Sequence, residues 1–270
     1  MQLKLSNGVL LMKSFDEIVD FLINIKKDTS EDRRIATEKE AVNAANEAVK
    51  ESSKKYIICN DAPVVIDWDK VVTFQDPSGL LLPDNCYKTY KNRREVSMLM
   101  SHWDVCLSSK ICFNVLKKRK LSVHFLIDND GTIYQIMDTN HIGYHAGNRK
   151  VNNASIGVEI SNAFYPRYQS TYVQKGFGER PIIKGAKVHG RTLEDHTGFY
   201  PVQIEAFKKL AESLNKHYDI PLETPLDNGD MKTVVDSSAR KALFKGVVNH
   251  FHITSRKIDC ASLNLHELFK

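Results

Sequence analysis

The sequence predicts an α/β fold in which a mixed central β-sheet is flanked by helices, with a small helical region at the N-terminus. Two observations predict the sheet. Short apolar segments recur after residue 95, and the turn sequence Asn129-Asp130-Gly131 separates two of them. A third observation predicts a covering helix, because apolar residues recur at helical spacing after Pro201.

Four segments are expected to be strands of this sheet. They are residues 96–102, 121–128, 132–137 and 155–160. The last of them is apolar enough to be a central strand. Helices are expected at 201–218, to cover one face of the sheet, and at about 236–247.

The N-terminal region carries two helix-start signals. Residues 14–17 and 37–40 both read as capping boxes, each followed by apolar residues at helical spacing. Turn signals dominate 61–94. We therefore expect a helical N-terminal extension at 1–60, a connector at 61–94 and the main domain at 95–270.

Composition excludes several classes of protein. The 270 residues are 42% hydrophobic with a net charge of +5, a charge too weak and scattered to argue for nucleic acid. No apolar run is long enough to span a bilayer, and we expect no signal peptide and no membrane insertion. The five cysteines lack CxxC spacing, which argues against a disulfide framework and a zinc ribbon. Nothing indicates an oligomeric state.

Histidines gather at positions where a catalytic metal site could form. His102 ends a predicted strand, and His250 and His252 precede Cys260 near the C-terminus. A catalytic zinc ion has three protein ligands, usually histidine, cysteine or a carboxylate, and keeps one position open for water. A histidine on one strand and a His…Cys pair in one loop would supply three such ligands.

Four segments of the sequence resemble the zinc-dependent N-acetylmuramoyl-L-alanine amidases, whose fold is shared by phage lysozyme-type amidases and peptidoglycan recognition proteins. The similarity covers about 95–270, in the order of the family, and leaves 1–60 outside. The segments are Met98-Leu-Met-Ser-His102-Trp, residues 122–135 from Ser-Val-His124 to Tyr-Gln, residues 143–160 with Gly-Tyr-His145-Ala-Gly-Asn148 and Glu159, and His250 to Cys260 with Arg256-Lys257.

The resemblance implies a zinc site and a catalytic pair. His102, His250 and Cys260 would bind Zn²⁺, Glu159 would act as the catalytic acid and base, and Lys257 would stabilise the oxyanion. The substrate-binding residues would be His145, His124 and Asn148.

The C-terminal ligands depart from the usual pattern of the family. His252 is an alternative to His250, and Asp259 is an alternative to Cys260. We expect His250 from the similarity of the local sequence, and Cys260 because a thiolate competes well for zinc. Many relatives have a tyrosine where this chain has Val123. A phenol therefore cannot be the catalytic group here, and we expect Glu159 to have that role.

The implied function is hydrolysis of the amide between N-acetylmuramic acid and L-alanine in peptidoglycan, for cell-wall lysis or remodelling. The alternative is a peptidoglycan-binding module without catalysis. The expected location is synthesis in the cytoplasm followed by action on the cell wall, as for a phage enzyme released by a holin, or on cytoplasmic muropeptides. The long aromatic segment 161–200 is expected to wall the substrate groove, or else to be a packing lobe.

Overall fold

The computed structural model describes Asn43, residues 55–90 and residues 92–270. The two N-terminal helices predicted from the capping boxes lie outside these residues, apart from Asn43. The chain divides into two compact units, Met1–Lys54 and Lys55–Lys270. The second unit therefore includes 61–94, the segment expected to be a connector.

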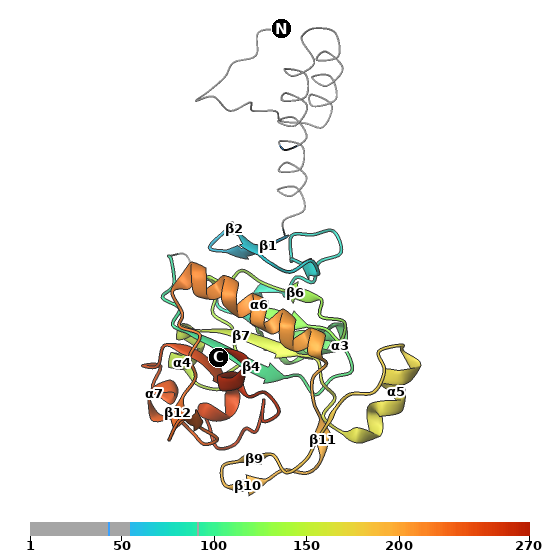
Figure 1. Cartoon of the computed structure of the whole chain (residues 1–270). Helices are drawn as coiled ribbons and strands as arrows, with labels where there is room; N and C mark the ends of the chain where they lie inside the picture. The colour runs from blue at the N-terminus through green and yellow to red at the C-terminus, as the bar shows by residue number, and fades with distance from the viewer. Residues whose placement is uncertain (1–42, 44–54, 91) are drawn as a thin grey trace, which may run out of the picture. The chain divides into compact units, whose positions relative to one another are not determined.

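A six-stranded mixed sheet forms the centre of this unit (Figure 1), as the sequence predicted. Its strand order is β14-β4-β7-β5-β6-β3. The first four strands are parallel, β6 is antiparallel to β5, and β3 is parallel to β6. The strands are β3 (Val71–Val72), β4 (Met98–Trp103), β5 (Phe125–Ile127), β6 (Ile133–Gln135), β7 (Ser155–Ile160) and β14 (Gly246–Asn249).

Helices pack on both faces of the sheet. Alternate residues of β4, β7 and β5 point to opposite faces, so Leu99, Ile156 and Phe125 join the core under α6. Leu126 points to the other face, which α3 covers. The helices are α3 (Ser109–Arg119), α4 (Arg149–Ala154), α5 (Gln169–Gln174), α6 (Pro201–Tyr218), α7 (Ser237–Arg240) and α8 (Leu265–Leu268).

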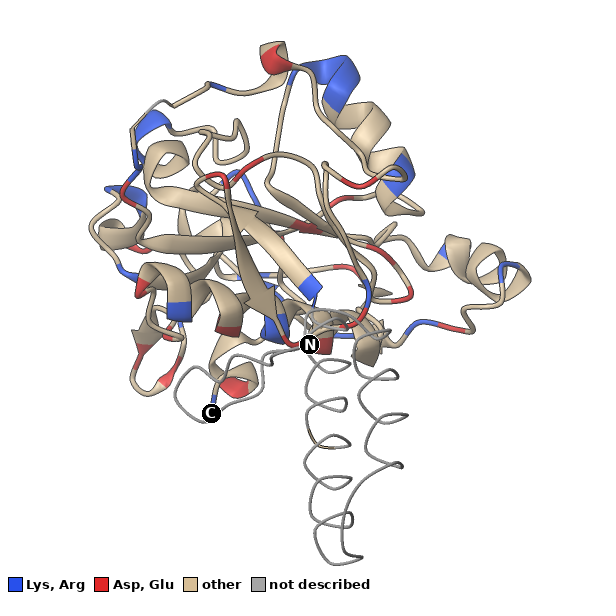
Figure 2. Ribbon diagram, turned by 90° about the horizontal axis from the view of Figure 1, so that it is seen from above, with Lys and Arg blue, Asp and Glu red and all other residues tan. Residues whose placement is uncertain are grey.

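The smaller elements are two-stranded ribbons and single helical turns. They are β1 (Lys55–Cys59), β2 (Ala62–Ile66), η1 (Asp84–Cys86), η2 (Pro166–Tyr168), β8 (Ile182–Ile183), β9 (Lys187–Val188), β10 (Arg191–Thr192), β11 (His196–Thr197), β12 (Leu226–Asp227), β13 (Asp230–Met231) and η3 (His250–His252). Lysines, arginines and acidic residues are interspersed over the described unit (Figure 2). None of its helices combines the length and the apolar character needed to cross a membrane.

One predicted element is wrong. The helix expected at about 236–247 is only four residues long, Ser237–Arg240, and the chain then enters strand β14. Val247 and Val248 are β-branched and pair in parallel with Leu99 and Met100 of β4, a long-range contact that local spacing does not reveal. This pairing places the C-terminal segment beside the end of β4.

Candidate metal and catalytic site

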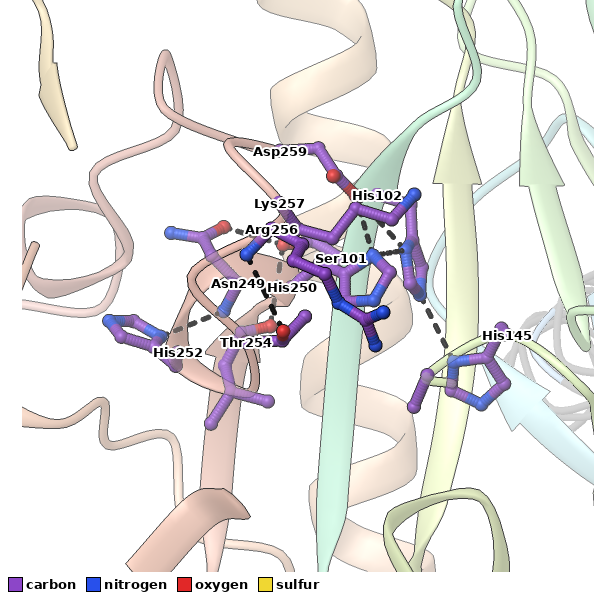
Figure 3. A network of polar contacts seen from close by, with 12 residues as sticks. Ser101, His102, His145, Asn249, His250, His252, Thr254, Arg256, Lys257 and Asp259 are labelled. Carbon is purple, nitrogen blue, oxygen red and sulfur yellow. Dashed lines mark hydrogen bonds and ion pairs between the residues drawn. The ribbon is translucent and has the colours of Figure 1, made fainter. Parts of the chain in front are cut away.

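Three buried side chains meet where β4 and β14 end side by side. His102 lies on β4, His250 directly follows β14, and Asp259 lies in the loop beyond. The Nδ1 atoms of His102 and His250 are 2.9 Å apart, and the Oδ2 atom of Asp259 is 3.2 Å and 3.0 Å from them, respectively. Figure 3 shows this group with the loop residues around it. Parallel pairing of the two strands thus brings together residues far apart in sequence.

The spacing of these three atoms fits a zinc ion. Tetrahedral bonds of about 2.0–2.1 Å place neighbouring ligand atoms about 3.3 Å apart, close to the observed distances. Two neutral imidazoles and one carboxylate are a usual zinc donor set and would leave the site with one net positive charge. The residues present therefore fit the metal that the resemblance implied.

Both kinds of ligand are held in the protonation state that a metal requires. Burial, followed by the neighbouring His250, lowers the pKa of His102 to about 4, so its imidazole is neutral at pH 7. Burial alone would raise the pKa of Asp259, but His250 and the hydrogen bonds from both histidines hold it well below its ordinary value. His102 and Asp259 are thus in the charge states in which they bind a cation.

His145 contacts the second nitrogen of His102. The Nε2 atom of His102 is 3.0 Å from Nδ1 of His145, and the two rings meet edge to face. Histidines that bind metals usually have their other ring nitrogen hydrogen-bonded, which fixes the ring orientation. A Cβ atom at Gly157 of β7 would lie 2.9 Å from the His145 ring, so the glycine leaves room for this ring against the sheet. His145 is thus placed to orient His102.

A cavity of about 340 Å³ opens over this group. Glu159 of β7 lines it and lies opposite His102 in the strand register. The Oε2 atom of Glu159 is shielded from solvent and has no hydrogen-bond partner among the described residues. Burial, and then the charges of Asp104 and Asp259, raise the pKa of Glu159 well above its ordinary value. A carboxyl group with a raised pKa can carry a proton at neutral pH.

Lys257 lines the same cavity from the C-terminal loop. It is exposed, and its charge favours the carboxylate form of Glu159. Arg119 and Arg256 also line the cavity, and no motif in the sequence identified Arg119. The wall of the cavity is therefore cationic beside the candidate metal ligands.

Cys260 does not join the metal group, contrary to the expectation from the sequence. Its thiol lies beside Ser101 in the core under α6, whereas the carboxylate of Asp259 points to His102. Ser101 and His102 also point to opposite faces, because they are consecutive residues of strand β4. Burial, and then the charge of Asp259, raise the pKa of Cys260 well above its ordinary value, which opposes formation of a thiolate. The structure therefore places Asp259, the alternative ligand, in this position.

His252 also lies apart from the group. Its Nδ1 atom accepts a hydrogen bond from the Asn249 amide at 3.0 Å, and its Nε2 donates to the Lys232 carbonyl at 2.6 Å. Both ring nitrogens are thereby used within the fold, and Figure 3 shows the contact with Asn249. The choice of His250 over His252 thus agrees with the geometry.

Two of the predicted substrate-binding residues lie away from this cavity. His124 is fully buried, with Nδ1 accepting from the Gly157 amide at 3.0 Å and Nε2 lying 2.9 Å from the His141 carbonyl. Asn148 caps α4 by accepting from the amides of Lys150 and Val151. Both side chains have structural partners, whereas His145 does line the cavity.

The aromatic segment 161–200 contributes both to the cavity and to the core. Phe164 and Tyr165 line the cavity, while Tyr172 is buried and stacks on Arg180. The Nε2 atom of His189, in the turn between β9 and β10, donates to the Lys257 carbonyl at 3.0 Å. The segment therefore borders the site loop, and only some of its rings are available to a ligand.

The family model described as N-acetylmuramoyl-L-alanine amidase matches residues 91–261. No curated protein matches the sequence.

Solved structures that are similar to this chain include two endolysins and AMPDH3. The endolysin amidase LysCS from Clostridium intestinale is 15% identical, with 74% of this chain and 92% of that chain covered and a TM-score of 0.42. AMPDH3 from Pseudomonas aeruginosa, solved with anhydromuramic pentapeptide, is 21% identical, with 70% of this chain and 65% of that chain covered and a TM-score of 0.42. A mutant endolysin from Bacillus subtilis is 17% identical, with 68% of this chain and 87% of that chain covered and a TM-score of 0.37.

Proposed function

Because this chain belongs to the N-acetylmuramoyl-L-alanine amidase family, we propose that it uses zinc to hydrolyse the amide between N-acetylmuramic acid and L-alanine in peptidoglycan. The observation that carries this proposal is the meeting of His102, His250 and Asp259 beneath a cavity that Glu159 and Lys257 also line. A metal group, a proton carrier and a cation are components that together can catalyse hydrolysis of an unactivated amide.

His102, His250 and Asp259 would hold the zinc ion. When bound, the ion polarises the scissile carbonyl and lowers the pKa of a water molecule. His145 keeps the His102 ring in place through the contact between Nε2 and Nδ1.

Glu159 is the proton carrier in this proposal. Its carboxylate accepts a proton from the attacking water and delivers it to the nitrogen of the leaving L-alanine. The carboxyl group faces the cavity, and its raised pKa favours the protonated form that the second step needs. The unpartnered Oε2 atom leaves the group free to exchange a proton with the substrate.

Lys257 stabilises the negative charge that develops on the carbonyl oxygen. Lys257 lines the cavity from the loop that also carries Asp259, so one loop positions both the lysine and a candidate metal ligand. Fixed positive charge beside a developing oxyanion contributes to the rate because it acts on the transition state more strongly than on the substrate.

The experiment is digestion of purified cell walls by the zinc-loaded protein, with mass spectrometry of the soluble products. We expect stem peptides that begin with a free L-alanine amine, and glycan strands that keep intact lactyl carboxylates. Chelation should stop release, and added zinc should restore it, which is the matched control. Binding of the protein to cell walls without any release of peptide would instead support the non-catalytic binding module.

A further inference from the structure

A second group of metal-ligating side chains lies beside β4, the strand that carries His102. Asp104 directly follows β4, Cys106 lies in the turn after it, and Cys112 is on α3. One carboxylate oxygen and the two sulfur atoms all lie within 4.8 Å of one another. We propose that Asp104, Cys106 and Cys112 form a second metal site that takes a thiophilic divalent cation such as zinc or cadmium.

The donor set selects this class of cation. Two cysteine sulfurs with one carboxylate oxygen suit borderline and soft ions, whereas magnesium and calcium prefer oxygen ligands only. Zinc–sulfur bonds of about 2.3 Å place two sulfurs about 3.8 Å apart in a tetrahedron. The observed group is open enough to admit an ion and close enough to bind it after small side-chain adjustments.

The carboxylate of Asp104 is held in position by its neighbours. Its Oδ1 atom accepts from the amides of Cys106 and Asn162, each at 2.9 Å, and its Oδ2 accepts from the Ser161 hydroxyl at 2.9 Å. Oδ2 keeps one lone pair for a further partner. No lysine, arginine or histidine of the described unit forms an ion pair with Asp104, so a cation would supply charge compensation that the described residues do not.

A neighbouring carboxyl group, Glu159, lies near this region. It is on the sheet face that α3 covers, and its charge raises the pKa of Cys112. Its shielded Oε2 atom has no hydrogen-bond partner among the residues described. A cation in the second group would therefore be attracted by Asp104, and Glu159 would add to this attraction in its carboxylate form.

Access and proton balance are both accounted for. Cys112 is buried at 3% exposure, but Cys106 and Asp104 are only half-buried, so an ion can approach from their side. On binding, each thiol releases one proton to solvent, and the two thiolates and the carboxylate neutralise the dication and leave one net negative charge. The ion would link the loop after β4 to α3, next to His102.

The test is a titration of the full, reduced chain with Co²⁺, followed by near-ultraviolet absorption. Sulfur bound to cobalt gives a thiolate-to-metal charge-transfer band, which the group of His102, His250 and Asp259 cannot give because it contains no sulfur. We expect this band in the wild-type protein and in Asp259→Asn, and we expect Cys106→Ser and Cys112→Ser to lose it. The wild-type protein should bind two equivalents of cobalt, and Cys106→Ser should bind one.

Two controls separate this inference from the proposed amidase site. Cys86→Ser changes a buried thiol in the core that also contains Cys112, and it should keep the band. Cys260→Ala changes the thiol next to Asp259 and should also keep it. Circular dichroism identifies any variant that fails to fold, and the half-buried position of Cys106 makes Cys106→Ser the safer of the two test variants.

Two outcomes would overturn the proposal. One is the absence of a charge-transfer band in the reduced wild-type protein, and the other is a band that disappears only in Cys260→Ala. Neither outcome bears on hydrolysis, because the release of stem peptides is measured separately.

Discussion

Asp259 and Cys260 are neighbours in sequence, but substitution of the first should weaken metal binding and substitution of the second should not. Asp259→Asn keeps the size of the side chain and removes the only anionic donor of the group that includes His102 and His250. Loss of partners that only support metal ligands already costs about 10–100-fold in affinity. We therefore expect zinc affinity to fall by at least about 100-fold, which corresponds to about 2.8 kcal/mol.

Cys260→Ala should leave zinc binding intact and reduce stability instead. The thiol is fully buried in the core under α6, so its removal leaves a small cavity there. We expect the free energy of unfolding to fall by about 1–2 kcal/mol. The two substitutions thus separate metal binding from core packing.

The assay is competition for zinc between each variant, made in the Cys106→Ser background so that the second group stays unoccupied, and a chromophoric chelator, with denaturant unfolding of the same samples. The reasoning would be refuted if Asp259→Asn bound zinc as the wild type does while Cys260→Ala lost it. Circular dichroism of Asp259→Asn before the titration establishes that the metal-free variant is folded.

Three further predictions concern the cavity and the fold around it. Glu159→Gln should retain zinc and lose about 10²–10⁴-fold in kcat, which is the usual contribution of acid–base catalysis. Near wild-type turnover by the zinc-replete variant would show that Glu159 takes no part in the mechanism. Burial lowers the pKa of His252 from 6.5 to about 4, so between these values the unfolded chain binds a proton that the folded chain does not, and stability falls with decreasing pH. Between pH 7 and 5 this costs about 2 kcal/mol, and denaturant unfolding should show a loss of stability that is smaller by this amount in His252→Gln than in the wild type, because other buried histidines such as His102 still contribute to it. Tyr165→Ala should lower kcat/KM on soluble muropeptides about tenfold with an unchanged Tm, because the ring lines the cavity. Tyr172→Ala should instead lower Tm, because that ring is buried. An unchanged kcat/KM in Tyr165→Ala would exclude Tyr165 from substrate binding.

The sequence predicted those parts of the fold that local patterns determine. Strand β7 has the predicted bounds, Ser155–Ile160, because its apolar run is bounded by polar residues. Long-range pairing decided the rest. Strand β14 was missed because only its register with β4 makes Gly246–Asn249 a strand.

The same distinction applies to the candidate site. His102, His250 and Glu159 could be identified because each occupies a matching position in a specific motif, and the structure brings all three to one cavity. The choice between Asp259 and Cys260 depended on which side chain enters the α6 core, and spacing does not contain that information. The role of Asn148 as a helix cap could have been found locally, since asparagine is a preferred N-cap residue.

The most direct test of the central claim is the rate of hydrolysis of a defined N-acetylmuramoyl peptide as a function of zinc occupancy. Metal-free protein is reconstituted in steps under conditions where the second group stays unoccupied, which Cys106→Ser ensures. The account predicts that cleavage between the lactyl group and L-alanine rises in proportion to occupancy and reaches its maximum at one zinc ion per chain. Full occupancy without cleavage, or cleavage within the stem peptide, would contradict it.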